Sequence, residues 1–537
     1  MNITTSNLLD AAGNILATTR IGTDLSQITI NSSAFDTSGH LTYRTNALGG
    51  VTSFSEALNG SGFDVLTTTN PDGGTRIETH YADGSVSSVT GTGAHGVGYV
   101  YGAATDGGVY HPYTAEIKLN ASGGNTTETM TNFSDAFGRV YKTYYGDGSA
   151  AETYYNILGQ VIQQVDPDGV SSLTAYDDKD EPEYAVADLN QNGVIDFNGT
   201  DRITQTISDA LYDANVGSYV SRTRTFVWAT NSSTNSLLVS VSESSTNGLQ
   251  RWQSAFGLTN TTVTVYGLAG ARTVTATNAD HSFSVTLYTN GLLTAVTSYD
   301  STGAQIGGTT YAYDTQGRQN QITDARNGTT TLTFNNADQT ATATTPYPGN
   351  GQSAQTTLYN YDTSQRVWNV INPDGTASTN LFYLTGETEE SFGARQYPVF
   401  NIFDYAGRMT NLTTWTNFNL GTGAAYTAWF YDAKRGWLNN KVDAAGHGPS
   451  YTYTPAGRLK TRTWGRGITS TNSYDTAGGL AILSYSDGKT PWVTNTYDRL
   501  GRLIGVVDGA GNRTLLYNNL NLLLSVQVSV HTIDTKL

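Results

Sequence analysis

The amino-acid sequence predicts an all-β fold, in which tandem β-hairpins form a long curved, spiralling sheet or a partial hollow shell. Three observations support this prediction. A Tyr-Asp or Phe-Asp pair recurs at short, regular intervals along much of the chain. Runs rich in β-branched and aromatic residues lie between the pairs, and Gly-containing turns separate those runs. No segment longer than about ten residues shows a convincing helical period.

The clearest copy of the repeat covers residues 497–518. It opens with Tyr497-Asp498, turns at Gly501-Arg502 and continues as an extended apolar run. It turns again at Asp508-Gly509-Ala510-Gly511 and ends at the next aromatic pair. Two short strands and two turns fit into about twenty residues, so one repeat is one hairpin with its connection. Further copies begin at Phe133, Tyr155, Tyr176, Tyr313, Phe334, Tyr361, Tyr383, Phe403, Tyr431, Tyr453 and Tyr474.

The second turn of the repeat is also recognisable. It takes the forms Asn70-Pro71-Asp72-Gly73, Asp166-Pro167-Asp168-Gly169 and Asn372-Pro373-Asp374-Gly375. Proline presets φ for the first central position of a turn, and Asp and Gly suit the positions that follow. Both connections of the hairpin are therefore predicted from turn chemistry.

These motifs resemble the RHS or YD-repeat family, whose pattern is Tyr-Asp-x-x-Gly-Arg, an extended run and an Asp-Pro-x-Gly-like turn. The resemblance covers at least residues 133–180 and 311–522. It implies a sheet that spirals into a hollow shell, as in bacterial polymorphic toxins, insecticidal toxin complexes and animal teneurins. The bacterial shells enclose a toxic C-terminal polypeptide. The resemblance thus implies a bacterial, secreted or cell-surface scaffold with an enclosed or C-terminal polypeptide partner.

A second function remains open at this point. The chain has 34 Tyr, and an aromatic-rich sheet could serve as a carbohydrate-binding module for a cell-surface glycan. The alternative interpretation of the repeated residues is architectural. On that interpretation Tyr packs between strands, Asp accepts hydrogen bonds from turn amides, and Arg pairs across repeats. Residues that occur once per hairpin favour the architectural interpretation.

The pattern divides the chain into five parts. Residues 1–130 are predicted as irregular β with degenerate hairpins, 131–180 as clear repeats, and 181–310 as a β insertion or degenerate repeats. Residues 311–522 return to the array, and 523–537 are expected to be a tail, with truncation of a longer polypeptide. The repeats should continue one sheet, because each hairpin packs on its neighbours and needs no new core.

Composition excludes several classes of partner. The formal charge is −16, and no basic stripe exists to neutralise phosphates, so we expect neither nucleic-acid binding nor attraction to an anionic membrane. No run approaches ~18 apolar residues, which predicts no membrane-spanning helix. The first residues lack the basic and apolar regions of a secretion signal. The chain has no Cys, so disulfides do not contribute.

The sharpest chemical signal is the loop that begins at Asp188. Oxygen donors recur at Asp188, Asn190, Asn192 and Asp196, Gly193 permits a sharp turn, and the carbonyl of Val194 stands at the seventh position. This spacing is typical of a calcium loop, because Ca²⁺ takes six to eight oxygen ligands. Gly199 stands where a bidentate Glu is expected, and Asp201 is the candidate substitute. The competing interpretation is a turn rich in Asp and Asn.

No catalytic residue is predicted, and we expect no enzyme. The seven His are scattered without metal-ligand spacing, and no Gly-x-Ser-x-Gly motif is present. Self-cleaving members of the resembling family carry an aspartate in an Asp-Pro-x-Gly motif near the end of the repeats. The nearest match, Asp508-Gly509-Ala510-Gly511, lacks the Pro and is predicted to be an ordinary turn.

Overall fold

The computed structural model describes residues 3–214, 216–518 and 522–529, and it confirms the all-β prediction. The described residues contain 44 strands in a single sheet and one short 3₁₀-helix, η1 (Leu268–Gly270). Each strand pairs antiparallel with the next strand in the sequence, from the first to the last. The sheet is therefore a pure meander. Segment 181–310, expected as an insertion or degenerate repeats, continues this same sheet.

The strands fall into three consecutive groups, which we call the first pass, the joining segment and the second pass. The first pass consists of β1 (Thr4–Leu9), β2 (Ile15–Ile21), β3 (Gln27–Phe35), β4 (Leu41–Asn46), β5 (Val51–Leu58), β6 (Asp64–Thr69), β7 (Thr75–His80), β8 (Val86–Thr90), β9 (Val97–Asp106), β10 (Val109–Leu119), β11 (Asn125–Ser134), β12 (Val140–Tyr145), β13 (Ala150–Tyr155), β14 (Val161–Val165), β15 (Ser171–Tyr176), β16 (Pro182–Asp188), β17 (Arg202–Asp213), β18 (Ser218–Val227) and β19 (Leu237–Ser245). The joining segment consists of β20 (Gln250–Ala255), β21 (Leu258–Tyr266), β22 (Arg272–Thr277), β23 (Phe283–Thr289) and β24 (Leu292–Tyr299).

The second pass carries most of the repeats that the sequence predicts. It consists of β25 (Gln305–Tyr313), β26 (Gln319–Asp324), β27 (Gly328–Phe334), β28 (Thr340–Thr344), β29 (Thr356–Tyr361), β30 (Val367–Ile371), β31 (Ala377–Phe382), β32 (Thr388–Gly393), β33 (Val399–Phe403), β34 (Met409–Asn417), β35 (Thr422–Tyr431), β36 (Leu438–Val442), β37 (Ser450–Tyr453), β38 (Leu459–Thr463), β39 (Thr469–Tyr474), β40 (Leu480–Tyr485), β41 (Val493–Tyr497), β42 (Leu503–Asp508), β43 (Gly511–Tyr517) and β44 (Leu523–Ser529).

The expected tail begins as a strand. Residues 523–529 form β44, which pairs antiparallel with β43, and residues 530–537 lie outside the described part of the chain.

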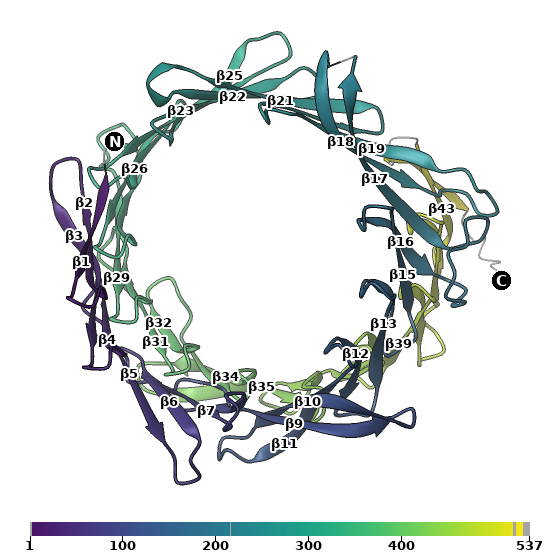
Figure 1. Ribbon diagram of the computed structural model, residues 1–537, viewed down its shortest axis with the longest axis horizontal. Helices are drawn as coiled ribbons and strands as arrows, with labels where there is room; N and C mark the ends of the chain where they lie inside the picture. Colours follow the sequence, from purple (N-terminus) through teal and green to yellow (C-terminus); the bar gives the residue numbers. More distant parts are fainter. Residues whose placement is uncertain (1–2, 215, 519–521, 530–537) are drawn as a thin grey trace, which may run out of the picture.

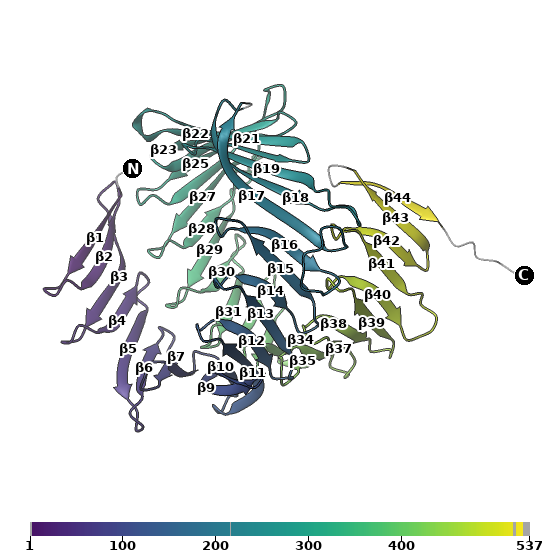
Figure 2. The ribbon, with the colours of Figure 1, turned by 45° about the vertical axis from the view of Figure 1, so that its right-hand side comes forward.

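The sheet winds into a ring around an open centre (Figure 1). The chain goes around once and then runs beside itself, so that the second pass lies along the first (Figures 1 and 2). Hydrogen bonds between the passes join residues 266 to 318 positions apart in the sequence. One circuit of the ring therefore takes about as many residues as the 290 that separate Ser26 from Gln316.

A meander alternates its turns between two rims, and here the rims differ chemically. Every fully described turn that follows an odd-numbered strand lies on one rim, which we call the Tyr-Asp rim because the Tyr-Asp-x-x-Gly-Arg turns lie on it. Every turn that follows an even-numbered strand lies on the other rim, the Asp-Gly rim, which carries the Asn/Asp-Pro-Asp-Gly turns. The repeat therefore gives the ring a direction.

The local chemistry of the Tyr-Asp turn explains its sequence. In the turn at 135–139, the Asp135 side chain accepts hydrogen bonds from the amides of Phe137 and Arg139. The Asp135 amide donates to the Arg139 carbonyl, and Gly138 adopts φ +80°, a conformation that favours glycine. Arg139 Nε donates a hydrogen bond to the Asp135 carboxylate at 2.7 Å. The motif is thus a turn that satisfies its own polar groups.

The single-layer sheet buries few side chains completely. Only Leu173, Val186, Ile203 and Trp228 form a contiguous buried cluster within the described residues, and Ile195 and Phe197 pack against it. This cluster lies on β15, β16 and β17 and in the connections beside them, next to the predicted calcium loop. Ile195 therefore anchors that loop in the core. No helix among the described residues has the length and apolarity needed to cross a membrane.

Candidate functional site

The predicted calcium loop connects β16 to β17 on the Asp-Gly rim. Its two end residues are the most buried carboxylates in the described chain: Asp188 and Asp201 are both 0% exposed. Asp188 accepts hydrogen bonds from the amide of Gly193 at 3.0 Å and from the hydroxyl of Ser171 at 3.2 Å. Asp201 accepts from the amides of Leu189 and Asp196, both at 3.0 Å. The two carboxylates therefore close the loop from both ends.

The exposed donors lie at the middle of the loop. The side-chain amides of Asn190 and Asn192 donate to Asp196 Oδ2 at 2.5 and 2.9 Å. The Asn192 side-chain oxygen accepts from the amide of Val194 at 2.8 Å. Residues 3–214, 216–518 and 522–529 hold no group of three or more His, Cys, Asp or Glu side chains arranged as metal ligands. The loop thus shows the bonding of a turn that satisfies its own carboxylates.

The oxygen chemistry of the loop is nevertheless suited to a hard cation. Carboxylate oxygens carry more than one lone pair, so an oxygen that accepts an amide hydrogen bond can also ligate Ca²⁺. Asp188 and Asp201 form no ion pair with any described Lys, Arg or His side chain, although both are fully buried. Burial of a carboxylate that has no ion-pair partner is costly, and a bound cation would offset that cost. The predicted residues therefore fit calcium by donor type.

Arg499 also belongs to this site, although the sequence pattern did not predict it. It comes from the turn between β41 and β42 on the second pass, and its side chain reaches the back of the acidic loop. Nε donates to the carbonyl of Asp201 at 2.7 Å, and Nη2 donates to the carbonyls of Asp196 and Phe197 at 3.0 and 2.9 Å. Nη1 donates to the carbonyls of Thr230 and Ser233 at 2.8 and 3.1 Å, and only 3% of the residue is exposed.

The environment of this guanidinium is unusual for an arginine. Burial lowers the pKa of Arg499, and the nearby Asp201 carboxylate acts in the opposite direction. All five hydrogen bonds run to backbone carbonyls of the first pass. One side chain of the second pass therefore holds together two loops of the first pass.

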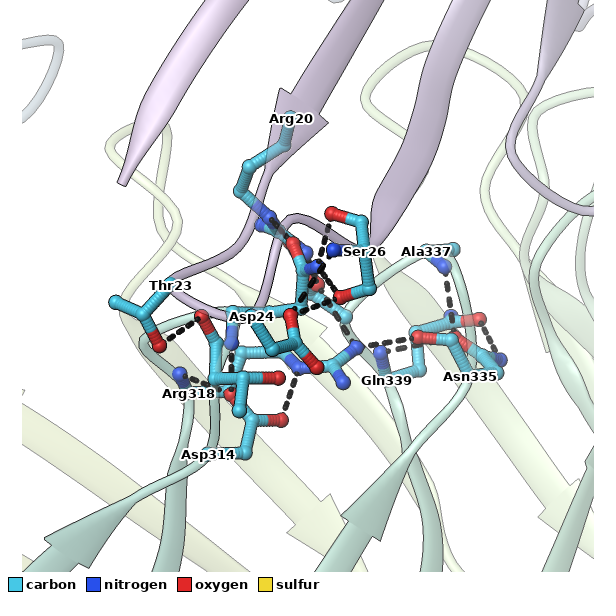
Figure 3. A network of polar contacts seen from close by, with 12 residues as sticks. Arg20, Thr23, Asp24, Ser26, Asp314, Arg318, Asn335, Ala337 and Gln339 are labelled. Atoms are coloured by element: carbon cyan, nitrogen blue, oxygen red, sulfur yellow. Dashed lines mark hydrogen bonds and ion pairs between the residues drawn. The ribbon is translucent and has the colours of Figure 1, made fainter. Parts of the chain in front are cut away.

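Arg499 is one of many contacts along a seam between the passes. The seam joins the Asp-Gly rim of the first pass to the Tyr-Asp rim of the second pass. Figure 3 shows its beginning, where Thr23 and Ser26 of the first pass meet the second-pass turn that contains Asp314 and Arg318. The bonded side-chain and backbone pairs along the seam include Arg20–Asp338, Ser26–Gln316, Asn46–Thr363, Asp72–Arg366, His95–Glu387, Glu128–Arg408, Ser149–Arg435, Asp168–Arg458 and Arg202–Asp475.

The motif arginines of the second pass supply part of the positive charge of the seam, and Arg20 and Arg202 of the first pass add to it. Arg408 keeps its bond to Asp404 within its own turn at 2.8 Å and also donates to Glu128 of the first pass at 2.9 Å. In the turn of Arg458, Thr454 replaces the usual Asp, and the guanidinium pairs entirely with Asp166 and Asp168 across the seam. Arg318 confirms the expectation that motif arginines pair across repeats, because it contacts Asp338 of the next repeat as well as Asp314 of its own turn. Arg408 and Arg458 instead have carboxylate partners one circuit away.

The motif tyrosines confirm the architectural interpretation of the repeat. Their hydroxyls donate to backbone carbonyls of a neighbouring strand, as Tyr431 does to Met409 at 2.7 Å and Tyr517 to Leu503 at 2.9 Å. The motif arginines also lie over the rings of the next repeat, with Arg408 4.9 Å from the centroid of Tyr431. These contacts occupy both the hydroxyl and one face of the ring. The repeated residues hold strands together and do not form an open ligand array.

The seam predicts a loss of stability in acid. A hydrogen bond from Arg20 holds the pKa of Asp338 below its usual value, and burial of Asp338 opposes this effect. Burial alone would raise the pKa of Asp168, but hydrogen bonds from Thr454 and Arg458 outweigh it and leave the pKa lowered. A carboxylate with a lowered folded pKa stabilises the fold above its unfolded pKa of ~4, and that stability is lost as pH falls through the folded pKa. We expect the midpoint of chemical unfolding to fall steadily as pH drops below about 4.

The double variant Asp168→Asn, Asp338→Asn tests the source of this acid sensitivity. It should be less stable than the unmodified chain at neutral pH and should lose less stability between neutral and acidic pH. Parallel pH profiles for the two proteins would contradict the assignment to the seam.

Comparisons with known proteins give structural matches but no sequence match. No protein-family model matches this sequence, and no curated protein sequence matches it. Among solved structures, the chain is similar to TcdB2-TccC3 without its hypervariable C-terminal region, with a TM-score of 0.49 and 12% identity, over 99% of this chain and 36% of that chain. It is similar to the Tc holotoxin pore of Photorhabdus luminescens with a TM-score of 0.43 and 12% identity, over 98% of this chain and 36% of that one. The chain spans about a third of the length of these proteins.

Proposed function

We propose that this chain is a wall segment of a β-shell that encloses or presents another polypeptide, within a secreted or cell-surface protein of the RHS type. The observation that carries the proposal is the unbroken sheet that winds around an open centre and is fastened to itself along the seam (Figure 1). A sheet that curves in this way separates an inside from an outside. The Tyr-Asp-x-x-Gly-Arg repeats support the assignment to the RHS type. No enzymatic activity is part of the proposal.

No contact favours the alternative of a glycan-binding sheet. The motif tyrosines, on which that alternative depends, are half-buried and bonded within the sheet. A glycan array probed with the intact chain would still detect such binding, and exposed tyrosines outside the motif, such as Tyr110 and Tyr397, are the first to substitute if it does.

Protection from proteolysis tests the enclosing role. The full polypeptide that carries this chain should be digested with a broad protease at neutral pH, and again after the seam has been opened with acid or denaturant. A segment outside the repeats is expected to survive in the first digestion and to disappear in the second. Equal cleavage of every segment outside the repeats under both conditions would contradict an enclosing shell.

We also propose that the acidic loop binds one structural calcium ion through Asp188, Asn190, Asn192, the Val194 carbonyl, Asp196 and Asp201. Two fully buried carboxylates support this proposal, since neither forms an ion pair with a described side chain, although the Arg499 guanidinium lies near Asp201. The loop lies between strands and against the seam, so the ion would fasten the wall and would not open a groove.

Calcium should raise the melting temperature of the chain. At a calcium concentration of about one hundred times Kd, the expected stabilisation is roughly 2.7 kcal/mol. Asp188→Ala lowers stability on its own account, so the quantity to compare is the difference between calcium and chelator, which this variant should lose. Asp177→Ala, on an exposed neighbouring turn, should retain it. The same melting temperature in calcium and in chelator for the unmodified chain would show that the loop is only a turn.

A further inference from the structure

The seam uses one rim of each pass and leaves the other two rims of the described chain uncovered. The Asp-Gly rim of the first pass and the Tyr-Asp rim of the second pass are joined. The Tyr-Asp rim of the first pass and the Asp-Gly rim of the second pass face outward at opposite ends of the ring (Figure 2). Each uncovered rim carries the same kind of turn as one of the covered rims.

Equivalent turn positions show what the seam covers. Gln316 and Phe137 both stand two residues after the motif Asp, but Gln316 is 5% exposed in the seam and Phe137 is 84% exposed on the uncovered rim. Arg499 and Ile157 both stand one residue after the Asp or Asn, at 3% and 102% exposure. The uncovered Tyr-Asp rim therefore exposes large apolar side chains at turn positions whose equivalents on the second pass are buried in the seam.

The cationic partner is also present on this rim. Arg139 forms the same bond to Asp135 within its turn that Arg408 forms to Asp404, and it lies over Tyr155 as Arg408 lies over Tyr431. Arg408 has a second carboxylate partner across the seam. Arg139 has no second carboxylate partner among the described residues.

The uncovered Asp-Gly rim supplies the matching acceptor. In the first two Asn/Asp-Pro-Asp-Gly turns, an aspartate forms an ion pair across the seam. Asp72 pairs with Arg366, and Asp168 pairs with Arg458. The third, Asn372-Pro373-Asp374-Gly375, lies on the uncovered rim. There Arg395 of the next turn on that rim is the one ion-pair partner of Asp374 among the described residues, and both side chains are exposed. This rim carries its own exposed apolar tips at Tyr347, Tyr397, Leu420 and Trp492.

We propose that the two uncovered rims bind each other between copies of this chain, so that rings stack head to tail along the ring axis. The occupant of each rim is a second copy, because that copy presents the complementary charges and the complementary rim of an interface that the chain already forms with itself. The contact is heterologous, since the two faces differ, and it leaves a free rim at each end of any stack. This inference does not depend on an enclosed cargo.

A heterologous contact makes a specific prediction for rim-blocked variants. Variant A carries Phe137→Asp and Leu158→Asp on the uncovered Tyr-Asp rim, and variant B carries Asp374→Arg and Leu420→Arg on the uncovered Asp-Gly rim. All four positions are exposed, so the ring should fold in both variants, and circular dichroism checks this. Leu268→Asp, on an equally exposed turn of the joining segment, is the matched control.

Sedimentation velocity over a range of concentrations provides the readout. The unmodified chain and the control should form assemblies whose mean mass rises with concentration, while variants A and B should each remain at 57.4 kDa. An equimolar mixture of A and B should double in mass and go no further, because one intact rim of each kind remains. A monomeric unmodified chain, self-association of either variant alone, or a mixture that stays monomeric would each overturn the proposal.

Discussion

Replacing Arg499 with alanine should lower the free energy of unfolding by about 3 kcal/mol, because hydrogen bonds to a charged group are worth ~1.5–3 kcal/mol each and unsatisfied buried carbonyls add a further cost. Five carbonyls from the 196–201 and 230–233 segments lose their donor at once. Water can reach some of them after the change, so the loss should be smaller than five separate bonds. Equilibrium denaturation measures the total effect.

Hydrogen exchange identifies where the stability is lost. In the Arg499→Ala variant, amides of 188–203 in the first pass should exchange faster, although the substitution lies about 300 residues away in the sequence. Arg395→Ala is the matched control, since that guanidinium makes one exposed ion pair and should change stability by less than about 0.5 kcal/mol. Faster exchange confined to the turn at 498–502 would contradict a seam held by this side chain.

Replacing Trp228 with alanine should cost about 3–5 kcal/mol, the usual range for a large buried aromatic residue. Trp228 is 5% exposed, packs 5.4 Å from Phe197 between ring centroids, and belongs to the cluster formed with Val186 and Ile203. A chain with so few fully buried residues has little capacity to repack around the cavity. Thermal or chemical unfolding measures the loss.

The same substitution should affect the acidic loop. Phe197 and Ile195 pack against the cluster from the loop itself, so loss of Trp228 removes the support beneath Asp196. Any calcium-dependent rise in melting temperature should therefore shrink in this variant. Trp492→Ala, at a residue that is 61% exposed on the uncovered rim, should leave both quantities nearly unchanged. A similar loss of stability from both tryptophan substitutions would show that the cluster is not the dominant core.

The sequence by itself determined the strands and most of the turns. Asp, Gly and Arg in the repeat act on atoms only two to four residues away, as Asp498 does when it accepts from the amides of Leu500 and Arg502. Such contacts depend on local backbone chemistry, which the residue pattern records directly. The oxygen donors of the acidic loop were recognisable for the same reason.

The partners across the seam were decided only by the tertiary structure. Arg499 stands at a turn position that other copies fill with residues as different as Ile157, Thr315 and Tyr405, so the repeat pattern gave no signal of its role. Which turn meets which depends on the circumference of the ring, and that circumference is the sum of small twists and bends over dozens of strands. No local pattern encodes the sum. The sequence therefore predicts the strands and turns of the sheet. Only the tertiary structure shows that the Arg499 guanidinium of the second pass binds the loop at 196–201 of the first pass.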